Sequence, residues 1–334
     1  MDKTVMEIWF DSFLLFPYKF LDYLTEEQWA PFKESAIYFV LKVDRKRIVD
    51  WGFEDGGIRI IYQNAKNKLY KSIGPFWFYD FIIPAGYVRV DVSSGSYLEV
   101  EITPEGLKYL EKNNPEALEH YNLSLSVKIA LYDLIAANEQ NCNTTESYSV
   151  QYIGQSMQIQ DRLTRHETIQ KIIRDLDLMD SDSETMILLY HPKSKFHVGF
   201  DIPYYKSIIW TGNSEWKNYS HIATEIGDKE LLDATEAMLI QYFKPQYNDN
   251  FKNTMPSNTQ KTFKKLEQNY INELNIGLQL QLSGNTTMHL TTESISTNKR
   301  KMIILSCDLS ALAKNKYSEI HVEEVSNWLF DIIN

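Results

Sequence analysis

Residues 146–166 constrain the fold most, because they join an alternating apolar run to a glycine and a charged helical segment. Tyr148, Val150 and Tyr152 occupy every second position, so a strand places all three side chains on one face. Gly154 follows them and predicts a tight turn. The stretch is therefore expected to form a strand, a turn and the start of a helix.

The helical part of this stretch carries a cation and an imidazole. Arg162 and His166 are four residues apart, so a helix places them on one face, one turn from each other. Beside the phenol of Tyr152, the two side chains would form a site suited to handling phosphate. Taken singly, these are ordinary residues of a core and of an exposed helix face.

Composition indicates a folded protein of the cytoplasm. The chain has 334 residues, of which 43% are hydrophobic and 13% aromatic, enough for more than one domain with its own core. Cys142 and Cys307 are too few for a disulfide framework or a thiolate metal site. No apolar run reaches the length of a membrane span, and we expect neither a signal peptide nor a membrane partner.

The formal net charge of -11 argues against a protein that coats nucleic acid without selectivity. Local positive charge is nevertheless present after residue 243. These cations are Lys244, Lys252, Lys261, Lys264 and Lys265. They are either a phosphate-binding surface or a solvated helix and loop.

The patterning predicts an α+β, multidomain chain. We expect a β-rich N-terminal domain at 1–115, a helix and linker at 116–145, a small antiparallel or mixed sheet flanked by helices at 146–255, and an α+β region at 256–334. Residues 1–30 are expected to be helical. Thr103 is expected to cap a helix that begins at Pro104.

Apolar periodicity locates further elements. Strands are expected at 36–43, 57–62, 78–83, 87–92, 97–102, 185–190, 195–200, 278–282 and 301–306. Helices are expected at 116–138, 168–176, 231–243, near 260–274 and at 322–333.

Glu236 interrupts the apolar stripe of the helix expected at 231–243. Leu232, Leu239, Ile240 and Phe243 form that stripe at helical spacing. An unpaired carboxylate buried there costs several kcal/mol, so Glu236 requires a cation or reaches water at the edge of the stripe. A metal ion or a basic side chain would meet that requirement.

Together the two segments resemble a GIY-YIG endonuclease domain over residues 146–250. Tyr152-Ile-Gly154 matches the second tripeptide of that family, and Arg162-Leu-Thr-Arg-His166 matches its Arg-x-x-x-His pattern. The segment from Glu236 to Asn248 resembles the metal-binding helix and terminal asparagine. Each half is a modest signal, and both in the right order are more specific.

The resemblance implies hydrolysis of phosphodiester bonds with one Mg²⁺ or Mn²⁺ ion as cofactor, held by Glu236. Arg162 would bind the scissile phosphate, Tyr152 or His166 would orient or deprotonate water, and Asn248 would fix the geometry. Tyr148 is a further candidate catalytic residue. Arg165, Lys244 and Lys252 are candidates for binding substrate.

The first tripeptide of the family, Gly-Ile-Tyr, is missing from the residues just before Tyr152. Tyr148 cannot stand across from Tyr152, because four residues of strand span about 13 Å. An unrecognised strand supplies the phenol, His166 acts without it, or the site is impaired.

We therefore expect an endonuclease that acts on DNA, with a role in restriction or phage defence inferred by analogy. A nucleic-acid-binding or interaction protein without activity, and an endonuclease that cleaves RNA, are the alternatives. The sequence leaves open whether copies of the chain form a homo-oligomer.

Overall fold

The computed structural model describes residues 3–33, 36–54, 57–64, 69–74, 85–92, 95, 97–113, 115, 126–131, 147–179, 182–199, 228–252, 261–269, 271–283, 286–297, 300–309 and 321–324. The chain mixes helices and strands, as expected of an α+β protein. The strand expected at 78–83, the linker at 138–145 and the aromatic segment at 202–226 lie outside the described residues. Among the described residues, no helix is long and apolar enough to cross a membrane.

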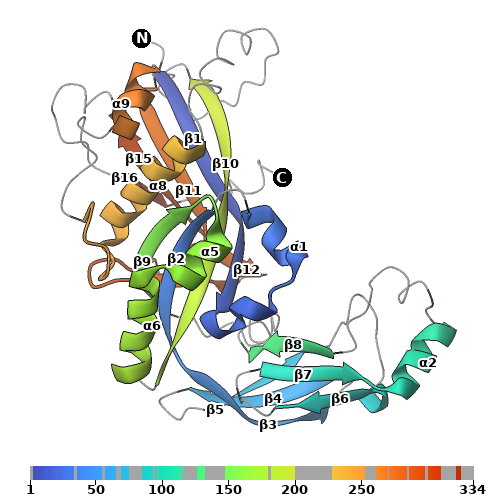
Figure 1. Cartoon of the computed structure of the whole chain (residues 1–334). Helices are drawn as coiled ribbons and strands as arrows, with labels where there is room; N and C mark the ends of the chain where they lie inside the picture. The colour runs from blue at the N-terminus through green and yellow to red at the C-terminus, as the bar shows by residue number, and fades with distance from the viewer. Residues whose placement is uncertain are drawn as a thin grey trace.

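A mixed eight-stranded sheet forms the body of the molecule (Figure 1). Its strands, in spatial order, are β14 (His289–Thr291), β9 (Ser147–Ser156), β2 (Ala36–Asp44), β10 (Ser183–Gly199), β1 (Lys3–Pro17), β11 (Glu273–Gln279), β15 (Met302–Asp308) and β16 (His321–Glu324). Strands from the start, middle and end of the chain therefore share one sheet. The sheet therefore includes strands from both sides of the domain boundaries expected at 115, 145 and 255.

The N-terminal segment corrects the expectation of a helix at 1–30, because β1 is a long strand in the middle of the sheet. It pairs antiparallel with β10 and parallel with β11. Met6, Ile8 and Phe10 recur every second residue and are at most 1% exposed. Period-two burial between two neighbouring strands is the pattern of a central strand, and it outweighs the helical reading of the aromatic residues.

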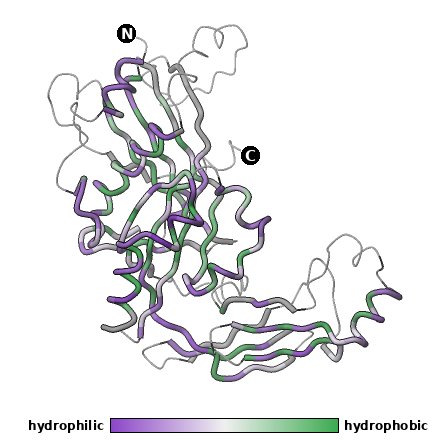
Figure 2. Tube along the Cα trace, viewed as in Figure 1, coloured by the Kyte–Doolittle hydropathy of each residue, from purple (hydrophilic) through white to green (hydrophobic). Residues whose placement is uncertain are grey.

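The two faces of the sheet carry separate hydrophobic cores. Helices α8 (Asp228–Phe243) and α9 (Lys261–Gln268) contribute to one core, which includes Ile37, Phe39 and Leu41 of β2. Helices α5 (Ile159–Arg165) and α6 (Glu167–Met179) and the 3-10 turn η1 (Tyr18–Tyr23) contribute to the other, with Tyr38 and Val40. In the hydropathy colouring, the strands of this sheet are largely apolar, as expected for a sheet covered on both faces (Figure 2).

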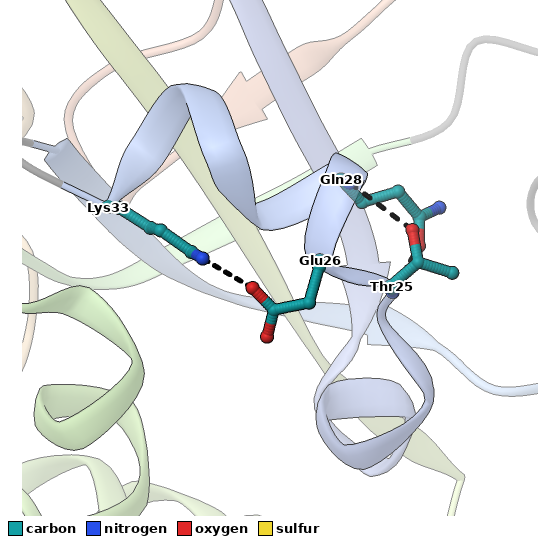
Figure 3. A network of polar contacts seen from close by, with 4 residues as sticks. All are labelled: Thr25, Glu26, Gln28 and Lys33. Carbon is teal, nitrogen blue, oxygen red and sulfur yellow. Dashed lines mark hydrogen bonds and ion pairs between the residues drawn. The ribbon is translucent and has the colours of Figure 1, made fainter.

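The short connection after η1 is held by a capping box. At α1 (Glu26–Trp29), Thr25 accepts a hydrogen bond from the Gln28 N–H, and the Gln28 side chain accepts one from the Thr25 N–H (Figure 3). Lys33 pairs with Glu26 on the exposed side. This local order places Trp29 and Phe32 in the second core, where they are 3% and 4% exposed.

An insertion at 45–146 separates β2 from its neighbour β9, and Figure 1 shows it projecting from one end of the main sheet. It contains a sheet of β3 (Lys46–Glu54), β4 (Gly57–Asn64) and β5 (Leu69–Gly74) and a sheet of β6 (Val88–Asp91), β7 (Tyr97–Ile102) and β8 (Ser126–Ala130). Ile60, Leu98 and Val100 belong to a third hydrophobic cluster. The insertion is therefore a β-rich unit with its own core.

Two expectations for the insertion have different outcomes. Helix α2 (Pro104–Asn113) begins at Pro104, and the Thr103 hydroxyl accepts a hydrogen bond from the Gly106 N–H at 3.2 Å, as expected of an N-cap. The helix expected at 116–138 is wrong for 126–130, which form β8 in register with β7. Pairing with an available strand outweighed the apolar spacing there.

The C-terminal elements follow the sequence expectation in part. Helix α9 and strand β15 overlap the basic helix expected near 260–274 and the strand expected at 301–306. The strand expected at 278–282 is divided between the end of β11 and β12 (Gln281–Ser283), and β11 begins at Glu273, inside the segment expected to be helical. A short hairpin pairs β12 with β13 (Thr286–Thr287). Residues 321–324 form strand β16 rather than the start of a helix, and 325–333 lie outside the described residues.

Candidate active site

Tyr38 places a second phenol beside Tyr152, of the kind that is missing from the residues just before Tyr152. β2 and β9 pair antiparallel, with Tyr38 opposite Gly154 and Val40 opposite Tyr152. The two tyrosine rings lie 6.0 Å apart at an angle of 37°. The strand supplying this second phenol is Ala36–Asp44, which precedes the long insertion.

Gly154 makes room for the phenol of Tyr38. Gly154 lies inside β9, so the turn expected at this glycine is wrong. A Cβ atom built at residue 154 would lie 2.4 Å from the Tyr38 hydroxyl oxygen and 2.9 Å from a ring carbon of Tyr152. The absence of a side chain therefore permits the close approach of both rings to the backbone of β9.

Tyr148 lies apart from this group, which corrects the expectation that it shares a face with Tyr152. The pairing of β9 with β2 shifts register between Tyr152 and Val150, as in a β-bulge. Gln151 is the extra residue of this bulge. Because side chains alternate between the two faces of a sheet, one extra residue moves the side chains before it to the opposite face from those after it. Tyr148 and Val150 consequently pack in the core with α8, whereas Tyr152 packs against the core with α5 and α6.

Arg162 reaches the two phenols from α5. Its Nε donates a hydrogen bond to the Tyr38 hydroxyl at 3.4 Å. Tyr38 is fully buried, and burial together with the neighbouring Tyr152 raises the pKa of its phenol well above its ordinary value, although Arg162 opposes the rise. Burial and Glu236 also raise the pKa of Tyr152. Both phenols are therefore protonated near neutral pH.

His166 stands at the corner between α5 and α6. Its backbone has φ -74° and ψ 119°, which ends α5 and separates it from α6, so the single helix expected through this segment is broken there. The imidazole lies 5.7 Å from the ring of Tyr152, and its Nδ1 atom is buried without a hydrogen-bond partner. Burial and the charge of Arg162 lower its pKa, so the ring is neutral near pH 7.

The edge of β9 beyond Ser149 is covered by the end of α8 and the residues after it. The Tyr247 N–H donates to the Gln151 carbonyl at 3.0 Å. The buried Asn248 accepts from the Ile153 N–H at 2.9 Å and donates to the Ile153 carbonyl at 2.8 Å. Asn248 thus takes the place of a neighbouring strand and fixes α8 along this edge.

The charge of Glu236, on α8, acts on both phenols and helps to raise their pKa values. A hydrogen bond with the backbone of Gln155 stabilises its charged form. Burial and the nearby Asp233 nevertheless raise the pKa of Glu236 to about 7, against the attraction of Arg162. Asp233 is held by the Gln155 side chain, whose Nε2 donates to it at 3.0 Å.

The expected substrate-binding residues come from α5 and from the chain after α8. Arg165 is exposed in the last turn of α5. Lys244 is exposed directly after α8, where the chain adopts φ 50°. Lys252 donates to the Gln246 carbonyl at 2.8 Å. Arg165 and Lys244 are therefore cations at the surface, and their binding of substrate stays a prediction.

The residues fit a hydrated divalent ion better than a closed metal site. Among the described residues, no group of three or more His, Cys, Asp or Glu side chains is placed to hold a metal. Glu236 is a largely buried carboxylate whose raised pKa reflects a charge without full compensation. One carboxylate together with waters and substrate oxygens is a common binding mode of Mg²⁺.

The sequence contained the signal for the missing phenol. Ala36-Ile37-Tyr38 differs from Gly-Ile-Tyr only in its first residue, and it begins a strand that was expected at 36–43. The insertion at 45–146 places it far from Tyr152 in sequence. Comparison of the chain with protein-family models, with curated proteins and with solved structures finds no match.

Proposed function

We propose that the chain is a metal-dependent endonuclease of the GIY-YIG type that hydrolyses phosphodiester bonds, with DNA as the substrate. The observation that carries the proposal is the placement of Tyr38 beside Tyr152 on paired strands, with Arg162 bonded to Tyr38. Tyr38 is distant in sequence from Tyr152 and Arg162, which both lie in the stretch 146–166. Tyr152 and Arg162 match the family pattern in the sequence, and Tyr38 is the candidate for the phenol that the pattern lacked.

Arg162 is the group that would bind the scissile phosphate. Its guanidinium lies partly exposed on α5 and matches the geometry of phosphate oxygens. The hydrogen bond to Tyr38 fixes the direction of the side chain before substrate arrives. Pre-organised positive charge is the main way in which a protein stabilises the charge that develops during phosphoryl transfer.

The protonation states suggest a division of labour among the other residues. Tyr38 and Tyr152 are neutral phenols near pH 7, so they can orient water or a phosphate oxygen by hydrogen bonding. His166 is a neutral imidazole, and it can accept a proton from the attacking water. The lowered pKa of His166 makes it available as a base at neutral pH.

Glu236 would hold one Mg²⁺ or Mn²⁺ ion, whose Lewis acidity would stabilise the leaving oxygen. The carboxylate must be ionised for this, and its pKa of about 7 places that ionisation near neutral pH. Asn248 would keep α8 against β9, and thereby keep Glu236 beside the phenols. Arg165, Lys244 and Lys252 would bind flanking phosphates.

Tyr38 also bears on the alternatives. The alternative of an inactive binding protein rests on a missing phenol, and Tyr38 offers a phenol on the strand that pairs with β9, opposite Gly154. This supports an enzyme over a binding protein. Preference for DNA over RNA, and a role in restriction or phage defence, are parts of the proposal that rest on analogy.

The test is a cleavage assay with plasmid DNA and with structured RNA, each with Mg²⁺, with Mn²⁺ and with chelator. We expect nicking or linearisation of DNA that requires metal and is lost in Glu236→Ala and Arg162→Ala. Glu111→Ala, which removes an exposed carboxylate on α2, is the matched control and should cleave like the unmodified chain. Failure to cleave either polymer with any metal would overturn the enzyme proposal, and cleavage of RNA alone would overturn the substrate.

A further inference from the structure

The corner between α5 and α6 is held by two side chains from outside α5. The last carbonyl groups of a helix have no partner within it, so they need other donors. The Tyr18 hydroxyl, from η1, donates to the Leu163 carbonyl at 3.3 Å. The Gln170 side chain, from α6, donates to the Thr164 carbonyl at 3.2 Å and to the Tyr18 hydroxyl at 2.8 Å.

These hydrogen bonds help to position two candidate catalytic residues, Arg162 in α5 and His166 at its end. The His166 N–H donates to the Arg162 carbonyl at 3.0 Å, and the His166 carbonyl accepts from the Gln170 N–H at 3.0 Å. A change in the corner would therefore move His166 and the last turn of α5 together. Among the described residues, Tyr18 forms hydrogen bonds with the corner and none with Tyr38 or Tyr152.

Two later residues of η1, Phe20 and Tyr23, contact the insertion. The ring of Phe20 lies edge-on to that of Tyr97 of β7, with centroids 5.6 Å apart. The ammonium of Lys128, from β8, lies 4.3 Å from the ring centroid of Tyr23 and 5.4 Å from that of Tyr97. These contacts are an edge-to-face aromatic pair and one cation that faces two aromatic rings, and they join η1 to the insertion.

We infer that Tyr18 is a positioning residue for His166 and Arg162, and that η1 couples the docking of the insertion to the geometry of the α5–α6 corner. The catalytic part of this inference rests on the proposed function. The coupling itself rests on contacts within six consecutive residues, Tyr18–Tyr23, which reach the corner at one end and the insertion at the other. Binding of a target by the insertion would thereby be transmitted to the corner through η1.

The first test compares Tyr18→Phe with Tyr190→Phe. Both substitutions remove a tyrosine hydroxyl that donates to a backbone carbonyl. The Tyr190 hydroxyl donates to the Gln279 carbonyl at 2.7 Å, in the other core. We expect Tyr18→Phe to raise the NMR titration midpoint of His166 by roughly half a pH unit as the corner loosens, while that of His289 stays unchanged. Tyr190→Phe should leave both midpoints unchanged.

The kinetic readout separates positioning from general destabilisation. In Tyr18→Phe, kcat should fall roughly tenfold with little change in KM or in the metal dependence, because a small misplacement of His166 affects the transition state more than binding. An unchanged His166 midpoint in Tyr18→Phe would overturn the inference. A shifted midpoint in a chain that cleaves nothing would uphold the positioning of His166 and refute the proposed function.

The second test addresses the coupling through a double-mutant cycle. Lys128→Met keeps much of the side-chain volume and removes the cation over Tyr23 and Tyr97. It should shift the His166 midpoint in the same direction as Tyr18→Phe, by a smaller amount. The double variant should shift it no further than Tyr18→Phe alone. Additive shifts, or no shift in Lys128→Met, would overturn the coupling.

Discussion

Gly154 lies directly opposite Tyr38 in the β9–β2 pair, and a Cβ atom at residue 154 would come within 2.4 Å of the Tyr38 hydroxyl oxygen. Tyr38 is fully buried, so its ring has little space into which it can withdraw. The position of the Tyr38 ring therefore requires glycine at residue 154. Substitution of the glycine tests this directly.

Gly154→Ala is expected to displace Tyr38 and to lower the free energy of unfolding by about 1–3 kcal/mol, the usual cost of overpacking a core. Cleavage should fall as well, since the hydrogen bond between Tyr38 and Arg162 would be lost. Gly86→Ala is the control, because a Cβ atom there would meet nothing within 4 Å. Urea denaturation measures the effect, and equal stability of the two variants would contradict the predicted clash.

Tyr38→Phe should reduce the cleavage rate by roughly a hundredfold or more, the size of effect usual for the loss of one pre-organised hydrogen-bond donor at the reacting centre. The ring stays in place, so the free energy of unfolding should change by only about 1 kcal/mol. Tyr148→Phe removes a hydroxyl from the same pair of strands but on the other face, and it should retain full activity. Full activity in Tyr38→Phe would exclude Tyr38 from the site.

Glu236→Gln should stabilise the metal-free protein at high pH. Because burial raises the pKa of Glu236 from 4.5 to about 7, the folded state holds the proton more tightly than the unfolded state between those pH values. The stability gained from that proton is lost as the pH rises through about 7, where a charge becomes buried. Glu236→Gln should therefore raise the free energy of unfolding by roughly 1–3 kcal/mol near pH 8 and by little near pH 4.5.

The same variant also reports on the metal. Mg²⁺ or Mn²⁺ should raise the melting temperature of the unmodified protein near pH 8 and lose this effect near pH 5, since protons compete for the carboxylate. Glu236→Gln should show no such rise at either pH. Stabilisation of Glu236→Gln by the metal, measured by calorimetry with chelator as the reference, would place the ion elsewhere.

Asn248→Ala should lower the free energy of unfolding by about 2–4 kcal/mol, because it leaves both the N–H and the carbonyl of Ile153 without partners in a buried place. Asn269→Ala is a milder comparison. Within the part of the chain that the structure describes, Asn269 donates one side-chain hydrogen bond, to the Lys265 carbonyl at the end of α9. Guanidinium denaturation should show the larger loss for Asn248→Ala, and similar losses would argue against its role at the edge of β9.

The sequence predicted local elements better than their assembly. The strands at 36–43, 87–92 and 97–102 and the cap at Thr103 depend on short-range pattern, and the structure confirms them. The helices expected at 1–30 and across 126–130 failed because pairing with distant strands decides those segments. No local pattern contains that information.

The candidate site shows the same limit. Tyr152, Arg162, His166 and Glu236 were selected from two segments, and the structure places Tyr152 beside both Tyr38 and His166. Tyr148 was misplaced because a single-residue bulge reverses the facing of β9, and bulges leave no clear mark in one sequence. Tyr38 was missed because a long insertion separates the two halves of one strand pair.

That insertion has a consequence for biosynthesis. Ala36–Asp44 leaves the ribosome long before Ser147–Ser156, and the pair between them closes a loop of more than a hundred residues, which costs entropy and is slow. Asn248, which completes the edge of β9, is made later still. A growing or truncated chain that ends before Asn248 therefore lacks one side of the candidate site, so under the proposed function cleavage would begin only when synthesis of the fold is nearly finished.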